Sequence, residues 1–270
     1  MKTKSLSIII VNYNTKALLK NCIDSIISHT SDVSYEILVV DNASTDGSQD
    51  MIKNQYPRVV LQCNNENVGF SRANNQGYRM SSGDYLLFLN SDTLIINGAI
   101  LTMLTYISNN PGVGIVGPKI VGPENKPSRS YMRFLDLKIL FLGSKYLSWA
   151  IDTKKYRLHY DNYDFSSTQN VPWLSGACLM TSRRIFMEAG CFDEHYFLYL
   201  EDMDLCMQVK KIGYSNIYLP EAEIVHLFGG SSAPKKSELK NIYSESVNHY
   251  FRKNFSIIEY WLAKLYFIMK

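Results

Sequence analysis

The sequence predicts an α/β protein built on a mostly parallel sheet. Leu6–Val11 is an apolar run broken only by Ser7, as expected of a strand buried on both faces. In the segment that follows, from Leu18 to Ile27, apolar residues recur three and four positions apart, as on one face of a helix. Because this alternation repeats along the first half of the chain, it indicates strands joined by covering helices.

The remaining elements follow in the same way. In the first half we expect strands at Glu36–Val40, Val59–Cys63 and Tyr85–Leu89, and helices at Ser48–Gln55 and Phe70–Ser81. Residues 118–170 are less regular, with one helical candidate at Leu135–Trp149, and we interpret them as an insertion that covers the site. Beyond them we expect a strand at Val171–Thr181, a helix from Ser182, a helix at Glu201–Ile212, and strands at Ser215–Leu219 and Ala222–His226.

The composition excludes several classes of protein. An apolar fraction of 46% indicates a folded core, and a net charge of +3 is too small to favour nucleic acid as a partner. The five cysteines are scattered and lack CxxC spacing, so we expect a reducing compartment and no disulfide framework or zinc knuckle. No run reaches the roughly 18 to 20 apolar residues of a membrane span, and the first apolar run is too short for a signal peptide.

Asn and Asp are concentrated just after the predicted strands. Asn12–Asn14, Asp41–Asp46, Asn64–Gly69 and Asn90–Asp92 each follow a strand of the first half. In parallel sheets, ligands bind beyond the carboxyl ends of the strands. These four loops therefore predict the binding site.

Two of the loops suit a nucleotide. The carboxylate of Asp41 could accept a hydrogen bond from the ring N3–H of uracil or thymine, although such a turn is also an ordinary helix cap. Gly69 opens a helix whose first turns carry Arg72 and Asn75, just after Asn67. Free N–H groups and a guanidinium suit a diphosphate or a nucleobase, and a plain capped helix is the alternative.

Three further residues each have a functional and a structural interpretation. Asp92 ends a buried strand and could bind Mg²⁺ or Mn²⁺ together with substrate phosphates, or simply cap the next helix. His226 could complete that metal site or be structural. Trp173 precedes the small residues Ser175 and Gly176; it could line a sugar pocket or belong to the core.

An acidic cluster opens the helix predicted at Glu201–Ile212. Glu201, Asp202 and Asp204 share its first turn, where the positive end of the helix dipole favours acids. Carboxylates this close also perturb one another, and a perturbed acid is what a general base requires.

The order of these motifs resembles a known family. VNYN, VDNASTDGS, NENVGFSRANNQG, LNSDT, WLSGACLM, FLYLEDMDLC and HLFGGSS occur in the order found in the inverting GT-A glycosyltransferases of family 2. The resemblance spans about Ser5–Phe255 and is strongest to the rhamnosyltransferase-like branch. One departure is Asn90, which stands where many relatives carry the first Asp of D-x-D and removes one charge from the metal site.

The resemblance implies a role for each site residue. Asp41 would bind the nucleobase, Asp92 the metal and diphosphate with help from His226, and Asp202, in preference to Glu201, would be the catalytic base. The cofactor would be Mg²⁺ or Mn²⁺. The other contacts to the nucleotide sugar would come from Asn12, Tyr13, Asn14, Asn67, Gly69, Arg72, Asn75, Asn90, Ser91, Trp173, Ser175 and Gly176.

The implied reaction is a single in-line displacement in the synthesis of bacterial-type cell-surface polysaccharide. The donor would be a dTDP- or UDP-sugar, with dTDP-rhamnose favoured, and the acceptor a glycan or polyprenyl-linked glycan. A nucleotidyltransferase is one alternative, but it should carry a glycine-rich loop where this chain has Asn12–Thr15. An inactive sugar-nucleotide-binding module is another, and it should have lost the carboxylates at 201–204.

We expect two parts in the chain. Residues 1–232 would form the catalytic domain, with a nucleotide-binding half at 1–117 and an acceptor half carrying the base at 118–232. Residues 233–270 would be a basic helical tail with an apolar stripe comprising Ile257, Ile258, Trp261, Leu262, Leu265 and Ile268. Such a stripe suits the inner face of a membrane, the catalytic domain or a second subunit of a homodimer, in an otherwise cytoplasmic protein.

Overall fold

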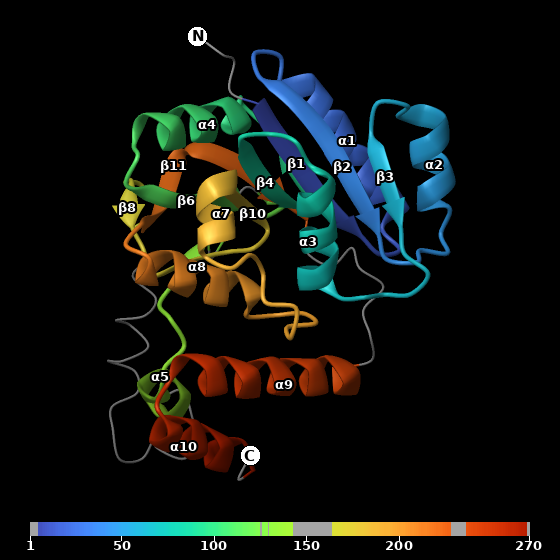
Figure 1. The fold of residues 1–270 in the computed structure, drawn as a ribbon. Coiled ribbons are helices and arrows are strands. Elements are labelled where there is room, and N and C mark those ends of the chain that lie inside the picture. The colour runs from blue at the N-terminus through green and yellow to red at the C-terminus, as the bar shows by residue number, and fades with distance from the viewer. Residues whose placement is uncertain (1–4, 125, 129, 143–163, 228–235, 269–270) are drawn as a thin grey trace.

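A mixed sheet runs through the middle of the molecule, and helices cover both of its faces (Figure 1). The computed structural model describes residues 5–124, 126–128, 130–142, 164–227 and 236–268. Within these residues the strands of the main sheet lie in the order β3-β2-β1-β4-β10-β6-β11-β5, with β8 beside β11. Beyond the sheet, a pair of helices forms a C-terminal extension. The α/β prediction with a helical extension is confirmed.

The first four strands of this order are parallel, and β10 lies antiparallel between β4 and β6. The main-sheet strands are β1 (Ser5–Asn12), β2 (Ser34–Asp41), β3 (Val60–Cys63), β4 (Tyr85–Asn90), β5 (Thr93–Ile95), β6 (Val113–Val121), β8 (Gln169–Asn170), β10 (Cys178–Ser182) and β11 (Ser215–His226). A separate pair joins β7 (Tyr131–Met132) to β9 (Trp173–Leu174). The helices are α1 (Lys16–His29), α2 (Ser48–Gln55), α3 (Phe70–Met80), α4 (Ala99–Asn109), α5 (Leu137–Leu142), α7 (Arg183–Glu188), α8 (Glu201–Lys211), α9 (Lys236–Asn254) and α10 (Ile257–Ile268).

The apolar runs of the sequence become strands that are buried on both faces. In β1, Ile8 and Ile10 enter the core beneath α1, α2 and α4, whereas Ile9 enters the opposite core with Phe186 of α7 and Leu205 of α8. Successive side chains of a strand point to opposite faces. Because both faces are covered, Ile8–Val11 are all apolar, and the run there is continuous rather than alternating.

Three expectations about the second half differ from the structure. Ser215–His226 is one strand rather than two; its register shifts between Leu219 and Glu223, where Pro220 cannot donate to the ladder. From Val171 to Thr181 only Cys178 onward joins the main sheet, because β9 pairs with β7. Residues 118–121 continue β6, so the segment expected as an insertion begins inside the sheet.

Some expectations concern residues outside the described ones. The helical candidate Leu135–Trp149 is represented by α5, and its remainder lies in 143–163. Likewise the boundary expected at 232 and the end of HLFGGSS lie in 228–235. The division of the chain into domains therefore stays a prediction.

Helix α9 is tied to the start of α8 by buried charge. Asp204 of α8 is almost fully buried, and it accepts hydrogen bonds from Lys253 (2.7 Å) and Asn254 (2.8 Å) of α9. Lys253 and His249 also bond to Asp193, at 2.8 and 2.9 Å. The extension therefore holds the segment that leads into α8, as well as covering the apolar cluster beneath it.

We predict that Lys253→Met lowers the free energy of unfolding by about 2–3 kcal/mol, because it removes the cationic partner of a buried carboxylate. The loss should stay at the lower end of what breaking a buried pair costs, since Asn254 and Gln208 still donate to Asp204. Urea denaturation monitored by circular dichroism measures it. Lys211→Met is the matched control, because Lys211 reaches the same Asn254 from an exposed position. Equal losses in both variants would contradict the prediction.

Candidate active site

A pocket opens where β1 and β4 lie side by side and their carboxyl ends meet. Its volume is about 180 Å³. Strands β1 and β4 are parallel neighbours, with β2 on the other side of β1, so the loops after all three lie at one edge of the sheet. The lining residues are Val11, Tyr13, Asn42, Asn67, Gly69, Phe70, Asn90, Ser91, Asp92, Phe197 and Leu198.

Some of these lining residues belong to the predicted set and others do not. Tyr13, Asn67, Gly69 and the run Asn90–Asp92 were expected from the loop sequences. Phe197 was not, because it enters from a segment more than a hundred residues away in the sequence. Its place as the first residue of the FLYLEDMDLC motif is the hint that the sequence offers.

The segment containing Phe197 packs directly on the start of α3. The amide of Phe70 donates to the carbonyl oxygen of Phe197 at 2.7 Å. Gly69 has φ +85°, and a Cβ there would lie 2.7 Å from the same oxygen. A side chain at position 69 would therefore push the segment off the helix. The amide of Phe70 at the start of α3 is therefore already hydrogen-bonded to the protein backbone.

Asp41 lies beside the pocket and is fully buried. Its carboxylate accepts hydrogen bonds from the side chains of Asn12 (2.7 Å) and Gln49 (2.7 Å) and from the amide of Ser44 (2.9 Å). These bonds fix the turn after β2. Because Asp41 is fully buried behind this turn, its contact with a nucleobase stays a prediction.

Asn12 and Asn14 connect the loops to one another. Asn12 accepts from Thr15, whose hydroxyl lies 2.8 Å from that of Ser91 in the β4 loop. Asn14 adopts φ +53° and accepts from the amide of Thr45 in the β2 loop. Through these hydrogen bonds both side chains hold the loops of the site against one another.

Arg72 and Asn75 project towards Glu194 rather than into the pocket. The Nε of Arg72 lies 3.2 Å from Glu194 Oε2, and the buried amide of Asn75 donates to Glu194 (3.1 Å) and to the carbonyl of Phe192 (2.8 Å). In this structure they fasten α3 to the segment before α8. Contact with a diphosphate would require Arg72 to leave its carboxylate partner.

Asp92 and His226 form the pair suited to a divalent cation. The Nε2 of His226 lies 3.0 Å from Asp92 Oδ1, and both side chains are mostly buried, with 13% and 14% of their surface exposed. Pairing of β5 with β11 sets this geometry, because it places His226 opposite Thr93. Asp92 also lines the pocket. A carboxylate and an imidazole fit Mn²⁺ or Mg²⁺, and the neighbouring Asn90 adds a neutral oxygen.

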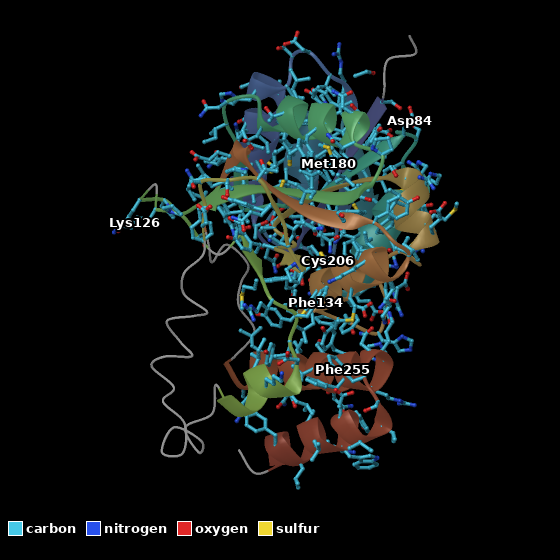
Figure 2. All side chains as sticks on the ribbon, turned by 90° about the vertical axis from the view of Figure 1, so that its left-hand side faces the viewer. Asp84, Lys126, Phe134, Met180, Cys206 and Phe255 are labelled. Carbon is cyan, nitrogen blue, oxygen red and sulfur yellow. The ribbon has the colours of Figure 1, made fainter. Side chains whose placement is uncertain are left out.

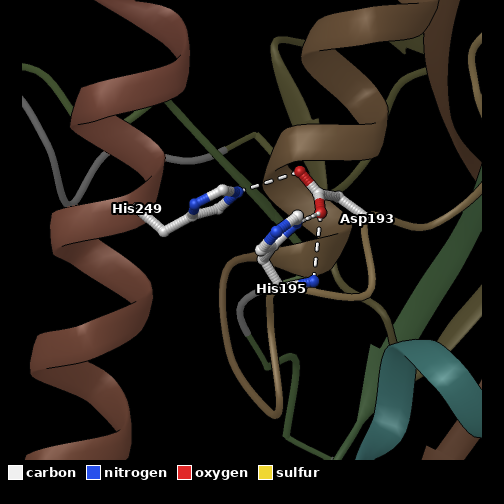
Figure 3. Close-up of side chains that lie close together, drawn as sticks. All are labelled: Asp193, His195 and His249. Carbon is white, nitrogen blue, oxygen red and sulfur yellow. Dashed lines mark hydrogen bonds and ion pairs between the residues drawn. The ribbon is translucent and has the colours of Figure 1, made fainter.

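A second group with metal-ligating atoms lies at the α9 contact. The ligand atoms of Asp193, His195 and His249 are all within 4.8 Å of one another (Figure 3). However, Asp193 Oδ2 also accepts from the ammonium of Lys253 at 2.8 Å. A cation bound there would face that positive charge directly. The cluster therefore acts as an ion-pair network between α9 and the segment before α8.

Asp202 is held by backbone amides. Its Oδ2 accepts from Gly176 and its Oδ1 from Met203, both at 2.7 Å. A Cβ at position 176 would lie 3.1 Å from the carboxylate, so a glycine permits this approach. Tyr199 and Leu200, with φ +74° and +68°, are in the left-handed region just before the helix. Such strain in residues other than glycine is typical of functional sites.

Glu201 and Asp202 have different environments. Burial raises the pKa of Asp202, and the two amides oppose that rise. Glu201 is more deeply buried, and its Oε2 has no hydrogen-bond partner among the described residues. Burial, and then the charge of Asp202, raise the pKa of Glu201 well above its ordinary value. The two amide donors thus favour the ionised form of Asp202 over that of Glu201.

Trp173 and Ser175 lie next to Gly176 in the chain. Trp173 is half-buried in β9 and contacts both the core beside β10 and the cluster beneath α8. Ser175 donates its amide to the carbonyl of Ser130 at 3.0 Å. Together they hold the loop that presents the Gly176 amide to Asp202.

We predict that Glu201→Gln stabilises the fold increasingly as the pH rises. The native state keeps the Glu201 proton that the unfolded chain releases above pH ~4.5, so native stability falls with pH by up to ~1.4 kcal/mol per unit until the raised pKa is reached. Glutamine removes this dependence. Thermal unfolding of both proteins from pH 5 to pH 8 tests it, with Glu188→Gln, an exposed partner of Arg184, as control. A constant difference between Glu201→Gln and the native chain across this range would refute it.

The chain is similar to two proteins that are named as rhamnosyltransferases. Over 244 residues the chain is 28% identical to the N-acetylglucosaminyl-diphospho-decaprenol L-rhamnosyltransferase of Mycobacterium tuberculosis, covering 83% of this chain and 76% of that protein. It is 24% identical to the rhamnosyltransferase WbbL of Escherichia coli K12, covering 81% and 82%.

Two solved structures share the fold. The mannosyltransferase PcManGT of Pyrobaculum calidifontis, in complex with GDP-Man and Mn²⁺, matches with a TM-score of 0.60 at 18% identity, and GalNAc-T7 with UDP, GalNAc and Mn²⁺ matches with 0.67 at 17%. The alignments cover 92% of this chain but 63% and 48% of those. The fold is thus of the GT-A type. The model of glycosyl transferase family 2 matches residues 7–190, and the chain belongs to this family of glycosyltransferases.

Proposed function

We propose that the protein transfers a sugar from a nucleoside-diphosphate sugar to a lipid-linked glycan, with inversion at the anomeric carbon. The observation that carries the proposal is the arrangement around one segment. Phe197 and Leu198 line the pocket that also contains Asp92, and Asp202 follows four residues later at the start of α8. The segment that lines the pocket thus leads directly into the turn that carries the proposed base.

The relatives support the choice of substrates. L-rhamnose is named in one relative and rhamnosyl transfer in both, which favours dTDP-rhamnose as the donor here. The name of the mycobacterial enzyme includes a diphospho-decaprenol acceptor, which favours a polyprenyl-linked acceptor. This donor and this acceptor both fit the synthesis of a cell-surface polysaccharide, which would take place at the cytoplasmic face of the membrane.

Residues on the donor side would bind the diphosphate. Asp92 and His226 would hold Mn²⁺ or Mg²⁺, whose charge would offset that of the departing diphosphate. Asn67 and Asn90 offer amides, and Ser91 a hydroxyl, at the wall of the pocket. The alternative of a nucleotidyltransferase is not supported, because the chain belongs to a glycosyltransferase family.

Asp202 would act on the acceptor side. It accepts the proton of the acceptor hydroxyl while that oxygen attacks the anomeric carbon, and the bond between that carbon and the diphosphate oxygen breaks in the same step. The electron pair of this bond leaves with the diphosphate, so no covalent enzyme intermediate forms. General base catalysis of this kind contributes about 10²–10⁴-fold. A neutral Glu201 avoids a second buried charge beside the base.

We predict that Asp202→Asn lowers kcat at least 100-fold and leaves the donor Kd unchanged. Glu201→Gln should stay within tenfold of the native kcat, because glutamine resembles the protonated acid. Release of nucleoside diphosphate in the presence of a polyprenyl-linked acceptor measures kcat, and calorimetry with dTDP measures binding. An inactive Glu201→Gln together with an active Asp202→Asn would reverse the assignment of the base.

We predict further that donor binding depends on a divalent cation held by Asp92. Calorimetry with dTDP and UDP, in Mn²⁺ and in EDTA, should show at least tenfold tighter binding with the metal, or ~1.4 kcal/mol. Asp92→Asn should remove most of that difference. Asp41→Asn should weaken nucleotide binding at least tenfold under both conditions if Asp41 reaches the base. Equal affinity of the native chain in Mn²⁺ and EDTA would show that the diphosphate is held without a cation.

A further inference from the structure

Helix α10 exposes one apolar face along its whole described length. Its start is fixed by a capping box, in which Ser256 and Glu259 exchange hydrogen bonds between side chains and backbone amides. The exposed side chains recur at helical spacing and keep between 42% and 69% of their surface in solvent. We call them the α10 face: Ile257, Ile258, Trp261, Leu262 and Leu265.

The opposite side of α10 already holds the helix in place. Ala263 and Tyr266 are buried in the cluster that contains Val247 and Phe251 of α9. In Figures 1 and 2, α10 lies at the end of the molecule, and α9 separates it from α8 and the sheet. The α10 face is therefore not needed to attach the extension, and its side chains stay exposed.

The segment of the sequence that contains this helix carries an excess of positive charge, although Lys253 within it is paired with Asp193 and Asp204. Residues 235–270 contain seven Lys or Arg and three Glu, a net charge of +4, whereas the preceding residues contain 21 Lys or Arg and 22 Asp or Glu, a net charge of −1. On α10 itself, Lys264 lies with its ammonium 4.9 Å from the centre of the Trp261 ring. The only acid of α10, Glu259, is taken up by the cap.

We propose that the α10 face inserts into the surface of an anionic lipid bilayer, with the helix lying parallel to the membrane. An apolar face with a Trp and basic neighbours is the pattern of an interfacial helix. Each basic residue near an anionic leaflet adds to the attraction. The proposal rests on the proposed function in one respect, because a polyprenyl-linked acceptor resides at such a surface.

Two alternatives fit the face less well. A membrane-spanning helix would need about 20 residues, and α10 has 12. No helix among the described residues is both long and apolar enough to span a bilayer. A second copy of the chain could cover the face, but the core of such an interface is depleted in lysine, and the excess of positive charge in this segment would then be repeated on both copies.

Binding at α10 would connect the membrane surface, through α9, to the turn that carries the proposed base. Helix α9 lies between α10 and α8, and Lys253 of α9 bonds to Asp204, two residues after Asp202. The element that contacts the bilayer is thus connected through one helix to the segment that carries the base.

Vesicle flotation of the full chain tests the proposal. The protein should float with vesicles of phosphatidylcholine containing phosphatidylglycerol, and much less with phosphatidylcholine alone or in high salt. The double variant Ile258→Ser, Leu265→Ser should bind at least tenfold more weakly, because two apolar side chains are lost from the buried face. The matched control is Ile27→Ser, Met187→Ser, which alters residues 52% and 59% exposed on α1 and α7 and should bind like the native chain.

Each outcome decides the question. Absence of flotation by the native chain with anionic vesicles, or equal weakening in both double variants, overturns the proposal. Sedimentation that shows a dimer dissociated by the α10 substitutions, without vesicle binding, would make the face a subunit interface and also overturn it. Calorimetry with dTDP separates this result from the proposed function, because the α10 variant should bind the nucleotide like the native chain. If the native chain itself does not bind dTDP, that result counts against the proposed function and not against the membrane proposal.

Discussion

Three carboxylates crowd the first turn of α8, and the need to accommodate them without bulk water shapes the rest of the site. Each is accommodated differently. Asp204 is buried and paired with Lys253 of α9, so the C-terminal extension is required by this charge as much as by its apolar cluster. Asp202 accepts two backbone amides, which stabilise its ionised form while burial raises its pKa. The Oε2 of Glu201 has no hydrogen-bond partner among the described residues, and burial raises the pKa of this carboxyl well above its ordinary value, which favours its protonated form. The difference between the neighbours Glu201 and Asp202 is what makes one of them suited to be a base.

The backbone that leads into the first turn of α8 is strained, and contacts with neighbouring helices hold it in place. Two consecutive residues with positive φ, Tyr199 and Leu200, would be unstable in a free loop. Here the preceding carbonyls are fixed on both sides, because Phe197 accepts from the amide of Phe70 and Leu198 accepts from Ser246 of α9 at 2.8 Å. Helix α3 and helix α9 thus clamp the loop from opposite ends of the sequence. Removing either contact should relax the loop before it unfolds the domain.

Much of the fold could be predicted from the sequence, because the information is local. Continuous apolar runs such as Ile8–Val11 follow from strands covered on both faces, and loops at the ends of parallel strands meet at one edge of the sheet. The partners of side chains could not be predicted, since they are distant in sequence. Nothing near Arg72 indicates that its guanidinium meets Glu194, 122 residues later. Likewise Asn42 rather than Asp41 lines the pocket, because Asn12 of the neighbouring strand turns the Asp41 carboxylate inward.

The proposed cation site also explains why a single carboxylate can suffice beside the pocket. Mg²⁺ and Mn²⁺ take about six oxygen or nitrogen ligands, and Asp92 and His226 offer two side chains, with Asn90 neutral. The remaining ligands must come from water and from the diphosphate of the donor. Cation affinity should therefore be low in the free protein and should rise when the donor enters, so that the two bind as a unit. A second aspartate at position 90 would hold the cation before the donor arrives, and it would oppose the negative charge that grows on the diphosphate as the sugar leaves. With asparagine there, the positive charge of the cation is directed mainly at the leaving group, which is where the reaction requires it.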